Sequence, residues 1–394
     1  MHKIHLKKKA EGLLEKHMYT IYSKWVKSDP TVPQGSYVSF VMNNETIGYG
    51  FYEKLGAIGA RIIAYKSEAP SNDFREIVRW RIAKAYRLRI ESGEKNENGY
   101  RLLYADSDGV PGLIADVYND TTVIQSTSKG WDRHSHILAQ EIVDMGVSKK
   151  VFLKNDQRAR KKLGLPIKKL YLVGRPPTRT TIREGDVDII VDYSLGHKTG
   201  FYLDQRGARL RVGRMRLEGF RVLDLFAYTG AFSLQALSAG ASEALMVEEN
   251  ADAVRLADEN LRRNGYRGRY QIIRGRVEKF LDRLAASKKR FDMVIVDPPS
   301  FIPSPEVRER GLRAYEKLYK KAITVTRHGG YIYASSCSFH LKKEELLEIL
   351  RESSYELGHE PRVIYEHTPI NSNPYTRIQD NELRYLKGFL LRLD

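Results

Sequence analysis

The stretch Val222–Asn250 constrains the fold more than any other part of the chain. It opens with a short apolar run that ends at Phe226, as a strand buried on both faces requires. A turn with Gly230 follows, and apolar residues then recur at helical spacing up to a second glycine. Another apolar run, Ala244–Val247, stops at Glu248. Strand, glycine turn, helix, strand and acid together predict an α/β fold with a parallel sheet.

This pattern is typical of a nucleoside pocket. The glycine turn lets the backbone approach a ligand closely, and Glu248 at the second strand tip can accept hydrogen bonds from both ribose hydroxyls. The chain lacks the full G-x-G-x-x-G of a dinucleotide site and the lysine of a P-loop, which disfavours a pyrophosphate ligand. S-adenosylmethionine carries no phosphate and fits better. A strand-turn-helix unit without a ligand is the alternative interpretation.

The charge balance indicates a polyanionic partner. The 394 residues, enough for two or three domains, include 66 Lys and Arg against 49 Asp and Glu, for a net charge of +17. Nucleic acid is the simplest such partner, although charge also promotes solubility. The single cysteine excludes an intrachain disulfide, and the histidines show no zinc-ligand spacing, so we expect no metal. Without an apolar signal core or a run of about 18 apolar residues, we expect a cytoplasmic protein with no membrane association.

Residues 1–70 predict a small β-rich domain. The segments 35–41 and 46–52 flank Asn43 and Asn44, a pair that tolerates positive φ, and this predicts a β-hairpin. A short basic helix is expected over residues 10–16. The aromatic residues Tyr19, Tyr22 and Trp25 lie among basic residues, which suits RNA stacking. For any one of them alone, a place in the core is the favoured interpretation.

Residues 71–185 predict a small α+β domain. A basic helix is expected over residues 74–89, followed by three strands and a helix over residues 135–145. The segment Lys149–Lys169 then holds nine Lys or Arg and one acid, with aliphatic residues between them. It predicts either a solvated face or a stripe that contacts RNA phosphates through Lys154, Arg158, Arg160, Lys161 and Lys162.

Residues 186–394 continue the α/β pattern, and two segments in them carry chemistry. A strand over residues 291–296 ends at Asp297-Pro-Pro-Ser-Phe301, and the carboxyl end of a parallel strand faces the ligand crevice. The prolines fix the backbone, so that Asp297 and nearby carbonyls can face an extruded base on which Phe301 stacks. The alternative is a strand ended by prolines.

Cys337 lies just past another strand, in Ser336-Cys-Ser338. A pyrimidine needs a nucleophile at ring position 6 before carbon 5 can attack an electrophilic methyl group, and a thiolate is the usual one. The thiol pKa, ordinarily about 8.5, would have to fall for this role. A buried, inert cysteine is the alternative.

Together these segments resemble one family over essentially the whole chain. It is the PUA-domain class I methyltransferases that form 5-methylcytosine in large-subunit ribosomal RNA, of the RlmI type. The resemblance is carried by six segments in order: Arg101–Leu113, Gly196–Arg206, Val222–Gly230, Asp297–Phe301, Ser336–Ser338 and Tyr385–Lys387. It implies a PUA domain, a central EEHEE domain and a Rossmann-like methyltransferase domain, with 23S ribosomal RNA as partner and a homodimer as the assembly.

The resemblance also implies roles for individual residues. Asp224 and Gly230 would line the methionine end of S-adenosylmethionine, Glu248 would hold its ribose, Asp297 would engage the edge of the base, and Cys337 would form the covalent adduct. Lys198 and Phe301 would contact RNA. The expected cofactor site consists of Gln205, Arg206, Asp224, Phe226, Tyr228, Thr229, Gly230, Glu248, Glu249, Asp297 and Pro298.

Where the family has an aspartate for the adenine amino group, this chain has Arg276. Two other activities stay open within the same class, methylation of a base nitrogen and formation of 5-methyluridine. A third hypothesis, from another class, is an RNA-binding factor without catalytic activity.

Overall fold

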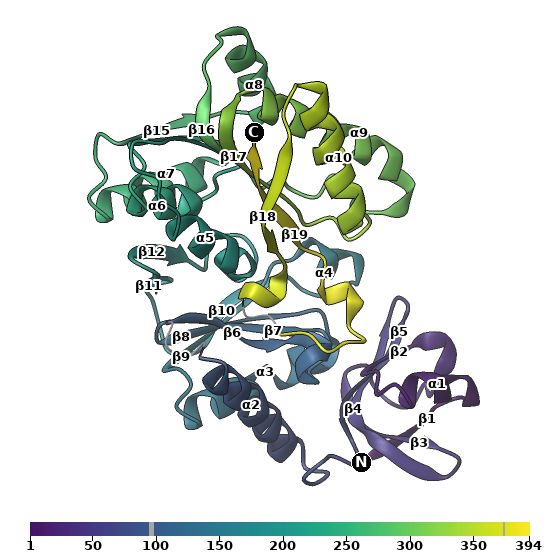
Figure 1. Ribbon diagram of the computed structural model, residues 1–394. Coiled ribbons are helices and arrows are strands. Elements are labelled where there is room, and N and C mark those ends of the chain that lie inside the picture. The colour runs from purple at the N-terminus through teal and green to yellow at the C-terminus, as the bar shows by residue number, and fades with distance from the viewer. Residues whose placement is uncertain (94–97, 373–374) are drawn as a thin grey trace. The chain divides into compact units, whose positions relative to one another are not determined.

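The structure, a computed structural model, describes residues 1–93, 98–372 and 375–394 (Figure 1). It divides into two compact units. The first comprises Met1–Ile182, Val191–Phe201 and Tyr375–Asp380, and the second comprises Arg183–Ile190, Tyr202–Pro374 and Asn381–Asp394. The predicted boundary between residues 185 and 186 therefore falls inside a segment of the second unit. No helix of the described residues is long and apolar enough to cross a membrane.

The first unit begins with a five-stranded sheet in the order β1-β3-β4-β5-β2. Asn43 and Asn44 join β3 to β4 with φ of 50° and 64°, which confirms the predicted hairpin. Tyr19 is buried in the core of this sheet, whereas Tyr22 is 41% exposed. The elements are β1 (His2–His5), η1 (Lys8–Ala10), α1 (Glu11–Leu14), β2 (Thr20–Tyr22), η2 (Ser23–Trp25), β3 (Ser36–Met42), β4 (Glu45–Leu55) and β5 (Ile58–Tyr65).

A second five-stranded sheet in this unit has the order β10-β9-β8-β7-β6. Three strands precede α3 rather than the two of the expected EEHEE pattern. The helix predicted over residues 135–145 begins at Lys129, because the Ser128 side chain accepts a hydrogen bond from Trp131 N (3.2 Å) and caps it there. The elements are α2 (Phe74–Glu91), β6 (Gly99–Tyr104), η4 (Ala105–Asp108), β7 (Leu113–Tyr118), β8 (Thr121–Ser126), α3 (Lys129–Asp144), β9 (Lys150–Asn155), α4 (Arg158–Lys162) and β10 (Lys168–Val173).

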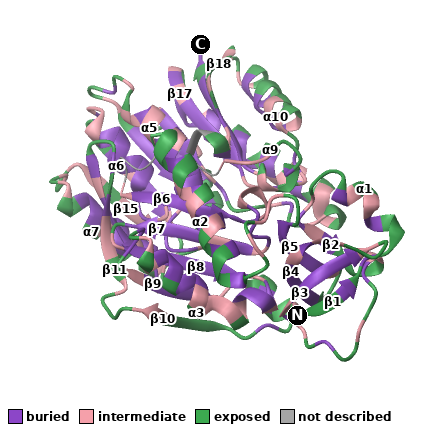
Figure 2. Cartoon of the chain, turned by 90° about the horizontal axis from the view of Figure 1, so that it is seen from below, coloured by how far each residue is buried: buried purple, intermediate pink, exposed green. Residues whose placement is uncertain are grey.

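Most strand residues of this second sheet are buried, while α2 keeps an exposed side (Figure 2). The core between the sheet and its helices includes Ile77, Leu103 and Trp131. A separate two-stranded sheet follows in the chain, formed by β11 (Arg179–Glu184) and β12 (Val187–Asp192).

The second unit contains a seven-stranded sheet in the order β15-β14-β13-β16-β17-β19-β18. The first five strands of this order are parallel, and β19 is antiparallel to both of its neighbours. The strands are β13 (Arg221–Leu225), β14 (Glu243–Glu248), β15 (Tyr270–Arg274), β16 (Phe291–Val296), β17 (Thr326–Ser336), β18 (Pro361–His367) and β19 (Lys387–Leu393). This arrangement confirms the expected Rossmann-like methyltransferase fold.

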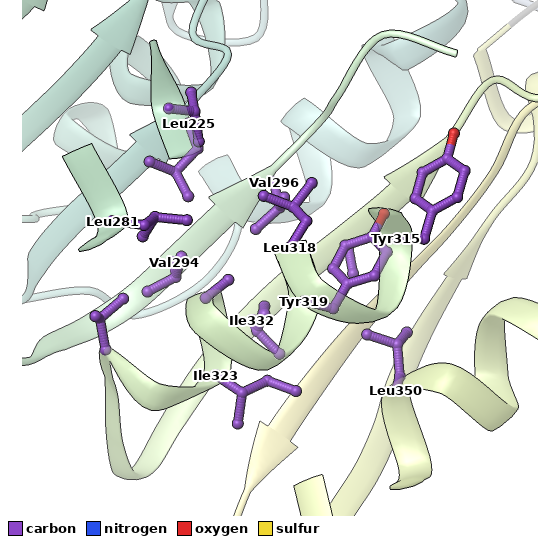
Figure 3. Packing of buried hydrophobic residues seen from close by; sticks show 14 of the residues in the cluster. Leu225, Leu281, Val294, Val296, Tyr315, Leu318, Tyr319, Ile323, Ile332 and Leu350 are labelled. Atoms are coloured by element: carbon purple, nitrogen blue, oxygen red, sulfur yellow. The ribbon is translucent and has the colours of Figure 1, made fainter. Parts of the chain in front are cut away.

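The helices of the second unit connect these strands and supply much of its core. Leu225, Val294 and Ile332 of the sheet pack with Leu318 and Tyr319 of α9 in one buried cluster (Figure 3). The helices are η5 (Leu203–Gln205), α5 (Arg206–Gly213), α6 (Ala231–Ser238), α7 (Ala251–Arg263), α8 (Val277–Ala286), η6 (Pro305–Val307), α9 (Arg308–Thr324), α10 (Lys343–Glu356), η7 (Pro369–Ser372) and η8 (Asn381–Leu383).

The register of the sheet decides where the candidate site lies. Leu225, the last residue of β13, pairs with Val296, the last residue of β16, and Val296 pairs with Ala334 of β17. The chain runs from β13 to β14 on one side and reaches β16 on the other, so β13 and β16 flank a topological switch point. Ligands of open α/β sheets bind at the carboxyl ends of strands at such a point.

Candidate active site

The glycine turn after β13 has an unusual backbone. Phe226, Tyr228 and Gly230 have φ of 61°, 48° and 75°, so three of five consecutive residues are left-handed. For the two residues with side chains this conformation costs roughly 1 to 2 kcal/mol each. Asn260 Nδ2 donates to the carbonyl of Thr229 (3.0 Å) and holds the turn from α7. Such strain is concentrated at ligand sites, where the surrounding structure maintains it.

Glu248, at the tip of β14, is the second support of the turn. Its Oε2 accepts from Tyr228 N (2.9 Å) and its Oε1 from Asn250 N (2.8 Å). Each carboxylate oxygen has a further lone pair, so the group can accept from a pair of ligand hydroxyls as well. The neighbouring Glu249 is exposed, and its carbonyl accepts from Arg274 Nε (3.5 Å).

Asp224 is buried beneath the turn, 1% exposed. Its Oδ2 accepts from Ser233 Oγ (2.7 Å) and Ser233 N (3.2 Å), both at the start of α6. Burial, with smaller contributions from the charges of Asp297 and Glu248, raises the pKa of the Asp224 carboxyl to about 7. Three carboxyl groups thus share one edge of the sheet, and this edge favours a cationic ligand.

Asp297 directly follows β16 and is fixed by its neighbours. Its Oδ1 accepts from Gln205 Nε2 (2.7 Å) and from Ser335 Oγ (2.5 Å). Tyr333 OH donates in turn to Gln205 Oε1 (2.8 Å). Ser335 and Tyr333 are not among the residues predicted from the sequence. The available signal was their alternation with Cys337, because residues two apart on a strand share one face.

A buried histidine supports Gln205 from the end of β18. Burial lowers the pKa of His367 to about 4, so its imidazole is neutral. Its Nε2 lies 2.9 Å from the carbonyl of Asp204, to which it can donate, and Tyr385 OH donates to Asp204 Oδ2 (2.5 Å). These contacts fix the short helix η5 that carries Gln205.

Cys337 follows the last residue of β17 and lies beside the proline corner. Its half-buried thiol is not part of a disulfide, and Sγ lies 3.9 Å from the carbonyl oxygen of Pro298. The structure therefore brings together the two segments to which the sequence assigned catalysis.

Buried hydroxyl groups connect these two segments. Ser338 Oγ lies 2.8 Å from Ser300 Oγ and 2.8 Å from Tyr315 OH, and it accepts from Ile302 N (3.1 Å). Ser336 Oγ donates to the same Tyr315 hydroxyl (2.8 Å). The proline corner and the cysteine loop are thus linked through one tyrosine of α9.

Two residues predicted to contact ligands, Phe301 and Arg206, are packed within the second unit, whereas Arg276 lies on its surface. Phe301 packs its ring against Tyr315, with centroids 4.8 Å apart, and belongs in part to the core. Arg206 is buried with its Nε 3.6 Å from Glu184 Oε2. Arg276 is 61% exposed and forms an ion pair with Glu278 (3.8 Å).

The predicted RNA-binding residues, all in the first unit apart from Phe301, differ in exposure. Arg160 is fully buried, and it donates to Asp132 Oδ2 (2.6 Å) and to the carbonyl of Ser126 (2.6 Å). Lys154 is 2% exposed and pairs with Asp156 (2.7 Å). Both cations are paired with acids inside the fold, which does not favour the phosphate contacts predicted for them.

The other members of this set are accessible. Arg158, Lys161 and Lys162 are exposed on α4. Lys198 is half-buried with φ of 50°, and its carbonyl accepts from Gln125 Nε2 (2.7 Å).

Known proteins resemble this chain along most of its length. The PUA-like domain family matches residues 4–65, and the family described as conserved hypothetical protein 95 matches residues 205–328. The crystal structure of SMU.776, solved in complex with SAH, covers all of both chains with a TM-score of 0.80 at 20% identity, which supports the fold.

Curated relatives are closer in sequence. Ribosomal RNA large subunit methyltransferase I of Yersinia pseudotuberculosis is 32% identical over 298 residues, 75% of each chain. The protein of the same name from Alteromonas mediterranea is 31% identical over 345 residues, which are 87% of this chain and 86% of the relative. With this identity and coverage, the chain belongs to the ribosomal RNA large subunit methyltransferase I family.

Proposed function

We propose that this protein is a cytoplasmic, S-adenosylmethionine-dependent enzyme that methylates carbon 5 of a cytosine in large-subunit ribosomal RNA. The observation that carries the proposal is the position of Cys337, whose sulfur lies 3.9 Å from the Pro298 carbonyl at the carboxyl edge of the sheet. The names of the relatives support RNA methylation, and the acidic edge supports the cofactor.

The residues at the switch point fit S-adenosylmethionine by their chemistry. The cofactor carries a sulfonium and an ammonium group, which the carboxyl groups of Asp224 and Asp297 complement. Glu248 has acceptor capacity for the ribose hydroxyls. Thr229 Oγ1 is buried and finds no hydrogen-bond partner among the described residues, so it is available to a ligand at the turn. Phe226, Tyr228, Gly230 and Pro298 would complete the pocket. When bound, the cofactor supplies an electrophilic methyl group.

In the proposed reaction Cys337 acts as the nucleophile. Its thiolate forms a bond to carbon 6 of the pyrimidine, which makes carbon 5 nucleophilic. After carbon 5 is methylated, loss of its proton to a base restores the double bond and releases the thiolate. The hydroxyl network around Tyr315 would keep the thiol at a fixed place relative to the proline corner.

Asp297 would orient the base. Hydrogen bonds from Gln205 and Ser335 hold one oxygen of its carboxyl group, so the group cannot rotate freely. A carboxyl group fixed in this way can bind the polar edge of an extruded base, and in its protonated form it can donate to ring nitrogen 3.

RNA would also contact the first unit. We propose that Arg158, Lys161 and Lys162, all exposed on α4, bind phosphates, and that the PUA-like domain binds the same 23S RNA. A homodimer is proposed from the family resemblance alone.

The decisive test replaces Cys337 by alanine. Wild type and Cys337→Ala are incubated with ribosomal RNA and cofactor labelled in the methyl group, and the nucleosides are analysed by mass spectrometry. We expect labelled 5-methylcytidine from the wild type and a loss of at least about 100-fold in the variant. Calorimetry with the cofactor is the control, because the variant should bind it normally.

The same analysis distinguishes the alternatives. A label on a base nitrogen, with full activity of Cys337→Ala, would replace the covalent mechanism by nitrogen methylation at the same corner. A label in 5-methyluridine would keep the mechanism and change the base. Absence of both cofactor binding and label would leave an RNA-binding factor.

A further inference from the structure

Lys387, the first residue of β19, places an amino group inside the second unit. The residue is 7% exposed and pairs in the sheet with Ser336 of β17. Burying a charged amine is unfavourable unless acceptors replace water. Its Nζ donates to the carbonyls of Ser338 and Leu341, both at 2.6 Å.

The two acceptors belong to the loop that begins with Cys337. The carbonyl of Ser338 also accepts from Leu341 N (3.2 Å), so this loop is a closed turn. Lys387 holds both ends of the turn from the neighbouring strand. The backbone on the carboxyl side of Cys337 is therefore fixed by a cation.

We infer that Lys387 is a positioning residue that holds the Cys337 loop and favours the reactive thiolate of Cys337 electrostatically. The inference rests on the proposed role of Cys337 as nucleophile. It adds a source of activation for the thiol, which the segment Ser336–Ser338 does not itself provide.

The charge environment supports this assignment. Burial lowers the pKa of Lys387 to about 8, while the charges of Cys337 and Glu345 act in the opposite direction. The attraction between opposite charges is mutual, so a protonated Lys387 favours the thiolate of Cys337 over the neutral thiol. Glu345 on α10 is itself paired with Arg308.

Two other ionisable groups with a described interaction with Cys337 are tyrosines, which do not stabilise a thiolate. On α9 the hydroxyls of Tyr315 and Tyr319 interact with the charge of Cys337, and burial raises the pKa of both. At the end of β16, Asp297 is an acid and would disfavour a second negative charge nearby. Lys387, by contrast, is a cation that interacts with the charge of Cys337.

Alkylation of the thiol by iodoacetamide tests this inference. Cys337 is the only cysteine of the chain, so the full-length protein reports on this thiol alone. The rate is measured from pH 5 to 10 for wild type, Lys387→Met and Lys387→Gln. Met removes charge and hydrogen bonds, whereas Gln keeps a donor for the loop.

We expect the midpoint of the pH–rate profile to rise in both variants, with alkylation at pH 7 slowed about tenfold. Lys343→Met is the matched control, because Lys343 lies on the surface of α10 and pairs with Glu366. Its midpoint should equal that of the wild type.

An unchanged midpoint in Lys387→Met and Lys387→Gln would overturn the inference, even if their plateau rates changed. If neither variant folds, the wild type alone decides, because a thiol midpoint at or above the ordinary value of about 8.5 contradicts the inference as well. Since alkylation requires no methyl transfer, this result is independent of the activity of Cys337→Ala.

Discussion

Replacing Gly230 by alanine should destabilise the second unit in two separable ways. The first is conformational, because φ of 75° is left-handed and costs an alanine roughly 1 to 2 kcal/mol. The second is crowding, because a Cβ there would lie 3.0 Å from Leu261 Cδ2 and 3.2 Å from Met246 Sδ. Both neighbours are flexible ends of side chains and can move, so we expect about 1 kcal/mol more.

The chain offers a matched control for the conformational part. Gly265 has φ of 82° and lies in the same unit, just past α7, but a Cβ there would meet nothing within 4 Å. Gly265→Ala should therefore cost roughly 1 to 2 kcal/mol and Gly230→Ala roughly 2 to 3 kcal/mol.

Urea unfolding of the two variants and the wild type measures this difference, with the slopes checked for equality. Calorimetry with S-adenosylmethionine should then show weaker binding for Gly230→Ala and unchanged binding for Gly265→Ala. Equal losses of stability in the two variants would refute the argument that the turn is packed tightly against α7 and β14.

Two further predictions concern the pH dependence of cofactor binding and the charge on α4. The folded pKa of Asp224 is raised to about 7, so ionisation of this group lowers the stability of the fold progressively as the pH rises from about 4 to 7, and the full cost applies above pH 7. Asp224→Asn removes this cost and should raise the free energy of unfolding at pH 8 by up to about 4 kcal/mol. The cationic cofactor needs the ionised form, so wild-type affinity should rise with pH through 7, and calorimetry should find weaker, pH-independent binding in the variant. If the affinities of both proteins changed equally with pH, another group would be responsible. Replacing Arg158, Lys161 and Lys162 by glutamine should weaken RNA binding and reduce its salt slope by roughly 1 to 3. The control replaces Lys288, Lys289 and Arg290, an exposed set of the same composition, and an equal effect in both triple variants would exclude a specific role for α4.

The strand tips of the candidate site could be predicted from the sequence, because their position follows from chain order. A residue at the end of a buried parallel strand, or directly after it, must emerge at the carboxyl edge of the sheet. This places Glu248 and Asp297 without knowledge of side-chain contacts. The same reasoning brings Cys337 to this edge, since β17 is the neighbour of β16.

The contacts between distant segments could not be predicted in this way. Gln205 reaches Asp297 only because η5 is held by β18 and by Tyr385, which lie far along the chain. Similarly, Arg160 looks like a surface cation in a basic run, and only the folded position of Asp132 shows that it is internal. A run of basic residues in the sequence shows where charge is concentrated, but the burial of each side chain depends on its tertiary neighbours.

The place of β19 between β17 and β18 has a consequence for synthesis of the protein. β18 precedes β19 in the chain but lies outside it in the sheet. The strand that leads to Cys337 is paired with β16 on one edge, but its other edge stays unpaired until residues 387–393 have left the ribosome. A nascent chain that stalls earlier leaves an unpaired, apolar strand edge that can associate with other chains. Lys387, which donates to the carbonyls of Ser338 and Leu341, belongs to the same late strand, so the loop after Cys337 is closed only once β19 has paired with β17.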